Sequence, residues 1–200
     1  MKKLFAILAI ALMMGACQTK SSSEAAAGGN DSTASADAPK TTLVAYFSAS
    51  DAHVTAQVAK TLAEAADADL FEIVPEKVYT AEDLDWKNEQ SRSTIEMKDS
   101  TARPAVASKV ENMDQYTTIY VGFPIWWYTA PRIVNTFLEQ YDLTGKTIIP
   151  FATSGGSDMG KSGEDLKKAS APTANWILPG QVLNDNPSVD SLKNWISSLK

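Results

Sequence analysis

The chain has 200 residues, of which 44% are hydrophobic and 21% charged, as in an ordinary globular protein; this excludes a collagenous or largely disordered chain. Its 24 acidic residues outnumber 18 basic ones, for a net charge of −6, and no basic patch stands out, so nucleic acid is not an expected partner.

Residues 1–17 have the pattern of an export signal. A positively charged start at residues 1–3 precedes an apolar stretch at residues 4–14, and Gly15-Ala16-Cys17 follows. The stretch is too short for a membrane-spanning helix. It resembles a bacterial lipoprotein signal, which predicts that residues 1–16 are removed and that Cys17 carries the lipid. Ordinary secretion with a free terminal cysteine is the alternative, and since Cys17 is the only cysteine, it cannot form an internal disulfide.

Residues 18–40 contain no large apolar side chain, so they cannot offset the entropy of ordering the chain. We expect residues 17–40 to be a flexible tether and the folded domain to span residues 41–200. Without Lys2 and Lys3 the chain keeps 16 basic and 24 acidic residues, a net charge of −8.

The folded part begins with LVAYFS (43–48), an apolar run that predicts a buried strand, and continues with helical spacing at 54–64. A strand that turns directly into a helix leaves backbone N–H groups where phosphates bind. Such loops usually contain glycine, which lets the backbone approach an anion closely. This one contains none.

Strand and helix patterns alternate along the rest of the chain. Further strands are predicted at 69–74, 117–123, 146–152 and 176–183, and the first three lack alternation, as in strands covered on both faces. Helices are predicted at 104–113, 131–140, 163–170 and 187–199. The alternation predicts an α/β fold with a parallel sheet between two layers of helices.

Residues 75–103 interrupt this alternation with a polar stretch that has no sustained period. Connections of this length usually have a function or are disordered. We expect an ordered insertion over the sheet edge, held by Tyr79, Leu84, Trp86 and Ile95.

Ligands bind such sheets at the carboxyl ends of the strands, which directs attention to the loops after Phe47, Phe123 and Phe151. The loop after Phe123 holds two tryptophans and a tyrosine, which favours a planar ligand over core packing alone. The loop after Phe151 is rich in glycine and serine, which either exposes backbone N–H groups to a ligand or makes a flexible turn.

From Thr41 onward the chain resembles flavodoxin-like proteins, through GFPIWWYTAP, FATSGGSDMG and the insertion LDW…SRSTIEMKD (84–99). The resemblance implies a three-layer flavodoxin-like fold, a five-stranded parallel sheet of order 2-1-3-4-5, and FMN as cofactor. The implied FMN contacts are Ser48, Ser50 and Thr55 at the phosphate, Pro124, Ile125, Trp126, Trp127 and Tyr128 on one side of the isoalloxazine ring, and Ser154, Gly155, Gly156 and Ser157 on the other.

The first loop departs from the family pattern, which is close to Ser-x-Thr-Gly-x-Thr. Ser50 stands for the first threonine, and Asp51-Ala52-His53 stands for the glycine. An inward Asp51 carboxylate would repel a phosphate, whereas one that caps the helix or faces water would not. His53, the only histidine, is either a solvated residue or, when protonated, a pH-dependent phosphate contact.

Together with the predicted export signal, the resemblance implies an exported FMN-binding electron-transfer protein, held at the membrane by its lipid alone, that exchanges electrons with a redox protein or a small acceptor. One alternative is an FMN-dependent NAD(P)H oxidoreductase acting on quinones or nitro compounds. Another is a binding module that has lost FMN through its altered first loop. The sequence offers neither a cysteine–histidine cluster for a transition metal nor a histidine-partnered nucleophile set.

Overall fold

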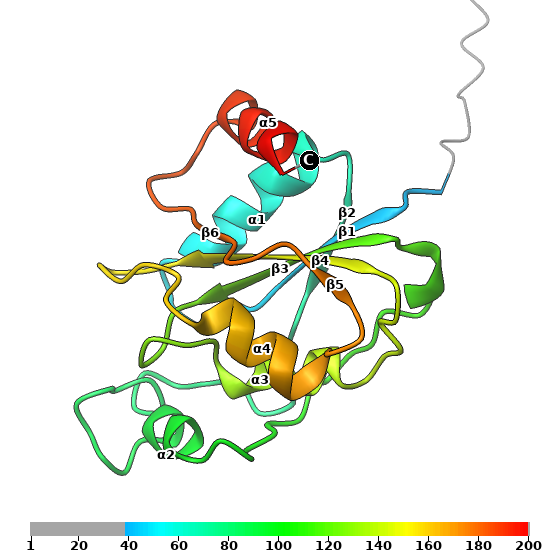
Figure 1. Ribbon diagram of the computed structural model, residues 1–200. Coiled ribbons are helices and arrows are strands. Elements are labelled where there is room, and N and C mark those ends of the chain that lie inside the picture. Colours follow the sequence, from blue (N-terminus) through cyan, green and yellow to red (C-terminus); the bar gives the residue numbers. More distant parts are fainter. Residues whose placement is uncertain (1–38, 200) are drawn as a thin grey trace, which may run out of the picture. The chain divides into compact units, whose positions relative to one another are not determined.

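The computed structural model describes residues 39–199 (Figure 1). The predicted signal, Cys17 and nearly all of the predicted tether lie outside the described residues. Within residues 39–199, no helix combines the length and apolarity needed to cross a membrane.

A parallel sheet forms the centre of the fold, in the order β2-β1-β3-β4-β5, with β6 also paired to β4. This confirms the expected α/β fold and strand order. The strands are β1 (Thr42–Tyr46), β2 (Asp69–Glu72), β3 (Thr118–Pro124), β4 (Thr147–Thr153), β5 (Asn175–Trp176) and β6 (Gln181–Val182).

The predicted last strand, 176–183, is in fact two short strands, β5 and β6, which pair with successive parts of β4. Pro179 between them has no N–H to donate to a ladder. Gly180 has a φ of +86°, and a Cβ on it would lie 2.2 Å from the carbonyl oxygen of Pro150. The chain therefore leaves the ladder at Pro179-Gly180 and rejoins it at β6.

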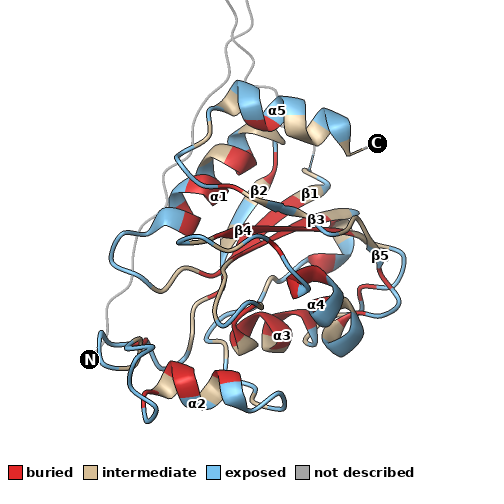
Figure 2. Cartoon of the chain, turned by 60° about the vertical axis from the view of Figure 1, so that its left-hand side comes forward, coloured by how far each residue is buried: buried red, intermediate tan, exposed pale blue. Residues whose placement is uncertain are grey.

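Burial along the strands follows their position in the sheet (Figure 2). β1, β3 and β4 are buried almost throughout, as predicted for strands covered on both faces. β2 instead alternates between half-buried and exposed residues, and Leu70 is 41% exposed. The prediction for 69–74 was wrong here because β2 is an edge strand.

The helices form the two outer layers (Figures 1 and 2). Helices α1 (Val54–Ala65) and α5 (Val189–Ser198) cover one face of the sheet, where Val58, Leu62 and Leu192 are buried. Helices α3 (Arg132–Leu138) and α4 (Ser162–Ser170) cover the other face, where Phe137 and Leu166 are buried. The helices predicted at these four places are confirmed.

The helix predicted at 104–113 does not form. Val106 pairs with Pro75 in an antiparallel bridge, and only a 3-10 turn, η1 (Met113–Gln115), follows. The apolar positions still contact the core, since Met113 is buried and Val106 and Val110 pack against it. Tertiary pairing therefore outweighed a short helical pattern that begins at a proline.

The insertion is ordered, and it contains helix α2 (Arg92–Lys98). Its two ends are tied by backbone hydrogen bonds from Glu76 N–H to the Ala105 carbonyl and from Ala107 N–H to the Val74 carbonyl, at 2.9 and 2.8 Å. Of the expected anchors, Tyr79 is buried and Leu84 is half-buried. Trp86 and Ile95 are 68% and 52% exposed, so they were wrongly predicted to hold the insertion.

Candidate functional site

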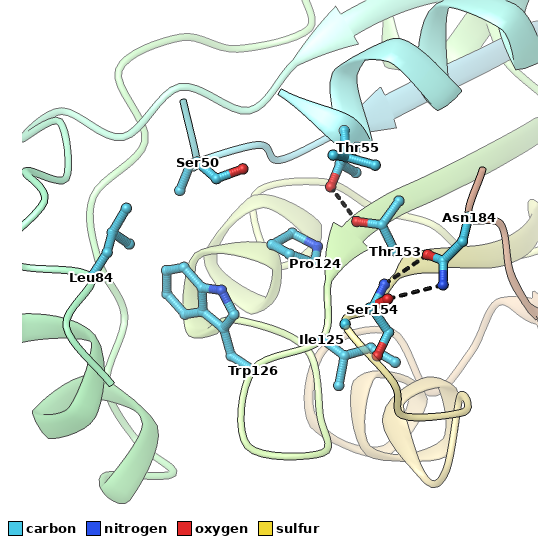
Figure 3. Close-up of a pocket in the computed structure, with 12 residues that line it drawn as sticks. Ser50, Thr55, Leu84, Pro124, Ile125, Trp126, Thr153, Ser154 and Asn184 are labelled. Carbon is cyan, nitrogen blue, oxygen red and sulfur yellow. Dashed lines mark hydrogen bonds between the residues drawn. The ribbon is translucent and has the colours of Figure 1, made fainter. Parts of the chain in front are cut away.

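A cavity of about 390 Å³ lies at the carboxyl ends of β1, β3 and β4 (Figure 3). We call it the first cavity. Three loops and two additional segments line it: Ala49, Ser50, Val54 and Thr55 from the first loop and α1, Pro124, Ile125 and Trp126 after β3, Thr153, Ser154 and Gly155 after β4, Leu84 of the insertion, and Asn184 after β6. Its volume falls within the range of about 300–1,000 Å³ that is usual for small-molecule sites.

The first loop enters α1 through a left-handed residue. His53 has φ 49° and ψ 31°, and its N–H donates to the Ser50 carbonyl at 2.9 Å. No side chain caps the helix, so the first N–H groups of α1 are left for another acceptor. Asp51 and His53 are both exposed and neither lines the first cavity, so the carboxylate faces water.

A pair of buried hydroxyls joins this loop to β4. The Oγ1 atoms of Thr55 and Thr153 lie 2.7 Å apart, and the two residues are 3% and 6% exposed. A buried hydroxyl that lacks a hydrogen bond is costly, so the pair holds both side chains where they line the first cavity. Figure 3 shows this bond between the start of α1 and the end of β4.

Asn184 holds the loop after β4. Its Oδ1 accepts from Ser154 N–H at 3.0 Å, and its Nδ2 donates to the Ser154 carbonyl at 2.9 Å. The Ser154 hydroxyl in turn accepts from the N–H groups of Gly156 and Ser157, at 3.2 and 2.7 Å. The two N–H groups are therefore used inside the loop rather than directed at the first cavity.

Trp126 forms an aromatic wall that the insertion supports. Its ring packs edge-on against Phe47 and Tyr79, with centroids 5.6 and 5.5 Å apart. The Tyr79 hydroxyl donates to Glu96 Oε2 at 2.5 Å, and Arg92 pairs with Glu96 at 2.6 Å while lying over the Tyr79 ring. Burial, and next the hydrogen bond to Glu96, raise the pKa of Tyr79 well above its usual value, so its hydroxyl stays protonated.

The next two aromatics turn away from the first cavity. Trp126 and Thr129 exchange backbone hydrogen bonds at 2.9 and 3.0 Å, and Trp127 and Tyr128 between them have φ values of 45° and 63°. A turn with two positive φ values normally contains Asn or Gly. Trp127 and Tyr128 instead project from it, 40% and 78% exposed, and they line a neighbouring cavity.

The structure thus gathers part of the predicted set at one place. Ser50, Thr55, Pro124, Ile125, Trp126, Ser154 and Gly155 line the first cavity, whereas Ser48, Trp127, Tyr128, Gly156 and Ser157 do not. Sequence reasoning missed Thr153, Asn184 and Leu84. The quoted FATSGG loop already contained Thr153, but no local signal marked Asn184, which reaches the site from beyond β6.

The chain resembles known proteins in both sequence and fold. Residues 41–199 match the sequence family described as Flavodoxin. A candidate flavoprotein from Bacteroides eggerthii DSM 20697 is 47% identical, with a TM-score of 0.74 over 79% of this chain and 96% of that one. A second, from Bacteroides uniformis ATCC 8492, is 51% identical, with a TM-score of 0.72 over 78% of this chain and 97% of that one.

A more distant flavoprotein, from Lactobacillus acidophilus NCFM, was crystallised in complex with FMN. It is 22% identical, with a TM-score of 0.58 over 74% of this chain and 95% of that one, so this likeness concerns the fold alone. No curated protein matches the chain significantly.

Proposed function

Because the chain belongs to the flavodoxin family, we propose that it binds FMN in the first cavity and serves as an electron-transfer protein of the cell envelope. The observation that carries this proposal is that the first cavity joins all three loops at the carboxyl ends of β1, β3 and β4. The Lactobacillus acidophilus flavoprotein of the same fold, which binds FMN, supports the choice of cofactor.

The donor set at the start of α1 suits a phosphate. Ser50 and Thr55 place hydroxyls at the first cavity, and α1 begins without a side-chain cap. Helix N–H groups and hydroxyls are the usual ligands of a phosphate, and they need no glycine when a left-handed residue already bends the loop. The exposed Asp51 does not oppose this arrangement, since water screens its charge.

The rest of the first cavity suits a flat ring. Trp126 and Leu84 lie on one side in Figure 3, and Ser154 and Asn184 on the other. Trp126 is held by Phe47 and Tyr79, so the wall is formed before a ligand arrives. FMN, when bound, supplies the one- and two-electron chemistry, and the chain binds it, orients it and limits its contact with water.

An FMN titration followed by flavin fluorescence tests the proposal, with riboflavin as the ligand that lacks the phosphate. We expect tight, quenched binding of FMN and weaker binding of riboflavin. Thr55→Val should weaken FMN binding about 10-fold by removing a hydrogen bond to a charged group, and should leave riboflavin binding nearly unchanged. Thr61→Val, on the exposed side of the same helix, is the matched control.

Two other outcomes would replace the proposal. If the protein fails to bind FMN and riboflavin binds no worse than FMN, residues 48–55 have lost the phosphate site, and the protein is a divergent binding module. If it binds FMN and turns over a small acceptor with NADH or NADPH as donor, it is a reductase rather than a carrier.

The envelope location rests on residues 1–17 alone. Mass spectrometry of the protein taken from its native membrane should find a lipid on Cys17, and Cys17→Ser should release the protein from that membrane. An unmodified Cys17 in a protein found in the soluble fraction would contradict the lipid anchor.

A further inference from the structure

Tyr79 of the insertion supports the aromatic wall of the first cavity without lining the cavity itself. It is 7% exposed, and its ring packs edge-on against Trp126 and Phe47, with centroids 5.5 and 5.8 Å apart. Trp126 and Phe47 also meet edge-on, at 5.6 Å. Because edge-to-face ring pairs have preferred orientations, the angle of the Tyr79 ring constrains the angle of the Trp126 ring.

Two residues of α2 hold the Tyr79 ring. Glu96 Oε2 accepts from the Tyr79 hydroxyl at 2.5 Å, and Arg92 lies over the ring, with its Cζ 3.9 Å from the centroid. Arg92 Nε also donates to the other carboxylate oxygen of Glu96, at 2.6 Å. A carboxylate makes a shorter and stronger hydrogen bond than a neutral acceptor, and a guanidinium is attracted to the face of an aromatic ring. The hydroxyl and one face of Tyr79 are therefore both held by α2.

Helix α2 is itself tied to the rest of the fold near both of its ends. Arg92 Nη1 donates to the Lys77 carbonyl at 2.6 Å. The Met97 carbonyl accepts from Arg132, the first residue of α3, at 3.2 Å. A side chain can fix the position of its neighbour only if its own carrier is fixed, and Glu96 meets this condition.

Stability alone gives little reason for a charged pair at this place. The side chains of Arg92 and Glu96 are only 17% and 14% exposed. The cost of taking two such charges out of water offsets most of their attraction, so a shielded pair adds little net stability. Such a pair can instead specify one geometry, and the geometry that it specifies here is that of the Tyr79 ring.

We propose that Glu96 is a positioning residue of the first cavity, which acts through the Tyr79 hydroxyl to hold the Trp126 ring in one orientation. The insertion thereby sets how tightly the flat ring of a ligand binds, whereas the start of α1 serves the phosphate. The identity of that ligand as a flavin rests on the proposed function. The order of the Trp126 ring is a property of the chain alone.

The test begins with the full chain free of ligand. The chain has five tryptophans, and Trp126→Phe identifies the indole N–H resonance of Trp126 in the NMR spectrum of ¹⁵N-labelled protein. The heteronuclear NOE and the relaxation dispersion of this resonance report motion of the ring from picoseconds to milliseconds. Tyr79→Phe keeps the ring of Tyr79 and removes its hydroxyl, so the motion of Trp126 should increase.

Tyr116→Phe is the matched control. Tyr116 is 6% exposed, and its hydroxyl also donates to a carboxylate, Asp69 Oδ2, at 2.8 Å. This bond lies at the amino ends of β2 and β3, whereas the first cavity lies at the carboxyl ends of the strands. The control therefore removes the same kind of hydrogen bond from the fold and should leave the motion of Trp126 unchanged.

Flavin affinity is the second readout. Tyr79→Phe should weaken binding of FMN and of riboflavin by the same factor, about 5-fold, because the wall faces the ring that the two flavins share. Thr55→Val should weaken FMN binding alone, since it alters the proposed phosphate site. Tyr116→Phe should weaken neither flavin.

Variants of Glu96 test its part in the arrangement. Glu96→Leu removes the acceptor and should reproduce Tyr79→Phe in both readouts. Glu96→Gln keeps an amide that can bond to the Tyr79 hydroxyl, so flavin affinity should stay within about 2-fold of wild type. This pair of variants decides the question should Tyr79→Phe fail to fold.

Unchanged motion of Trp126 in Tyr79→Phe would overturn the proposal, as would an equal increase in Tyr116→Phe, which would show a general loosening of the fold. Glu96→Gln that behaves like Glu96→Leu would also overturn it, because the hydrogen bond would then not be the cause. Failure of the wild type to bind either flavin would instead overturn the proposed function, and the measurements on ligand-free protein would still decide the role of Glu96.

Discussion

Replacing His53 with glycine should stabilise the protein. His53 is the N-cap of α1 and adopts φ 49° and ψ 31°, where a Cβ is crowded by its own backbone. Its side chain is exposed and makes no capping hydrogen bond, so the substitution removes no contact that the structure provides. The family pattern has glycine in this part of the loop, and the backbone has kept the conformation that glycine prefers.

The size of the effect follows from two opposing terms. Relief of the left-handed conformation is worth about 1–2 kcal/mol. Glycine loses more chain entropy on folding, which takes back about 0.5–1 kcal/mol. The net gain lies between about 0 and 1.5 kcal/mol, and its central value of about 0.75 kcal/mol corresponds to a rise in Tm of roughly 1.5–3 °C for a domain of this size.

Urea denaturation of wild type, His53→Gly and His53→Ala measures this gain. Alanine keeps the crowded Cβ, and loss of the exposed imidazole removes no contact, so the free energy of unfolding should be highest for Gly and nearly equal for His and Ala. If alanine stabilises as much as glycine does, the effect comes from the imidazole, and the backbone argument is refuted.

The same variants decide the role of the imidazole in FMN binding. Because His53 does not line the first cavity, the ratio of FMN affinities at pH 5.5 and pH 8 should be the same in wild type and His53→Gly. A pH dependence that disappears with the imidazole would restore the hypothesis of a protonated phosphate contact.

Three further predictions concern the site, the core and alkaline pH. Asn184→Ala should weaken FMN binding about 5-fold or more, because it removes the hydrogen bonds to both backbone groups of Ser154. Calorimetric titration of the variant and wild type measures this, and equal affinities would refute it. Gly122→Ala should destabilise the fold by about 1–3 kcal/mol in urea denaturation, because the new Cβ would lie 2.1 Å from the buried ring of Phe151; an unchanged midpoint would contradict the packing. Burial, and next a hydrogen bond to an aspartate, raise the pKa of Tyr116 from 10.0 to about 12, so the folded state keeps a proton that the unfolded state releases. The free energy of unfolding should therefore fall as pH rises from 10 to 12. In Tyr116→Phe this fall should be less steep, because one fewer proton is released on unfolding. Identical pH profiles for the two proteins would show that Tyr116 does not contribute.

The amino-acid sequence was sufficient for the layers of the fold. Runs such as TTIYVGF are apolar on both faces, and helices such as α3 place Ile133, Val134 and Phe137 on one stripe, so local patterns predicted the sheet and its covering. The resemblance to flavodoxins added the strand order. Local patterns gave a wrong prediction where pairing between distant segments set the backbone conformation. At Val106, for example, a helix was predicted, and the residue instead forms an antiparallel bridge with Pro75.

The candidate site was predictable only in part. The three loops could be placed because the carboxyl ends of parallel strands meet at one edge of a sheet. The positive φ values of Trp127 and Tyr128 turn these two side chains away from the first cavity, so that only Trp126 of the three aromatics lines it. Asn184 enters from a segment far along the chain, and nothing in the neighbouring sequence marks it.

The sequence by itself therefore determined most of the strands and helices and the loops that meet at the sheet edge, because periodicity and turn chemistry are local. Only the tertiary structure decided that His53 bends the first loop as a glycine would, that Trp126 lines the first cavity whereas Trp127 does not, and that Asn184 holds the backbone of Ser154. Each of these depends on which residues, distant in sequence, are brought together, and no local pattern records that.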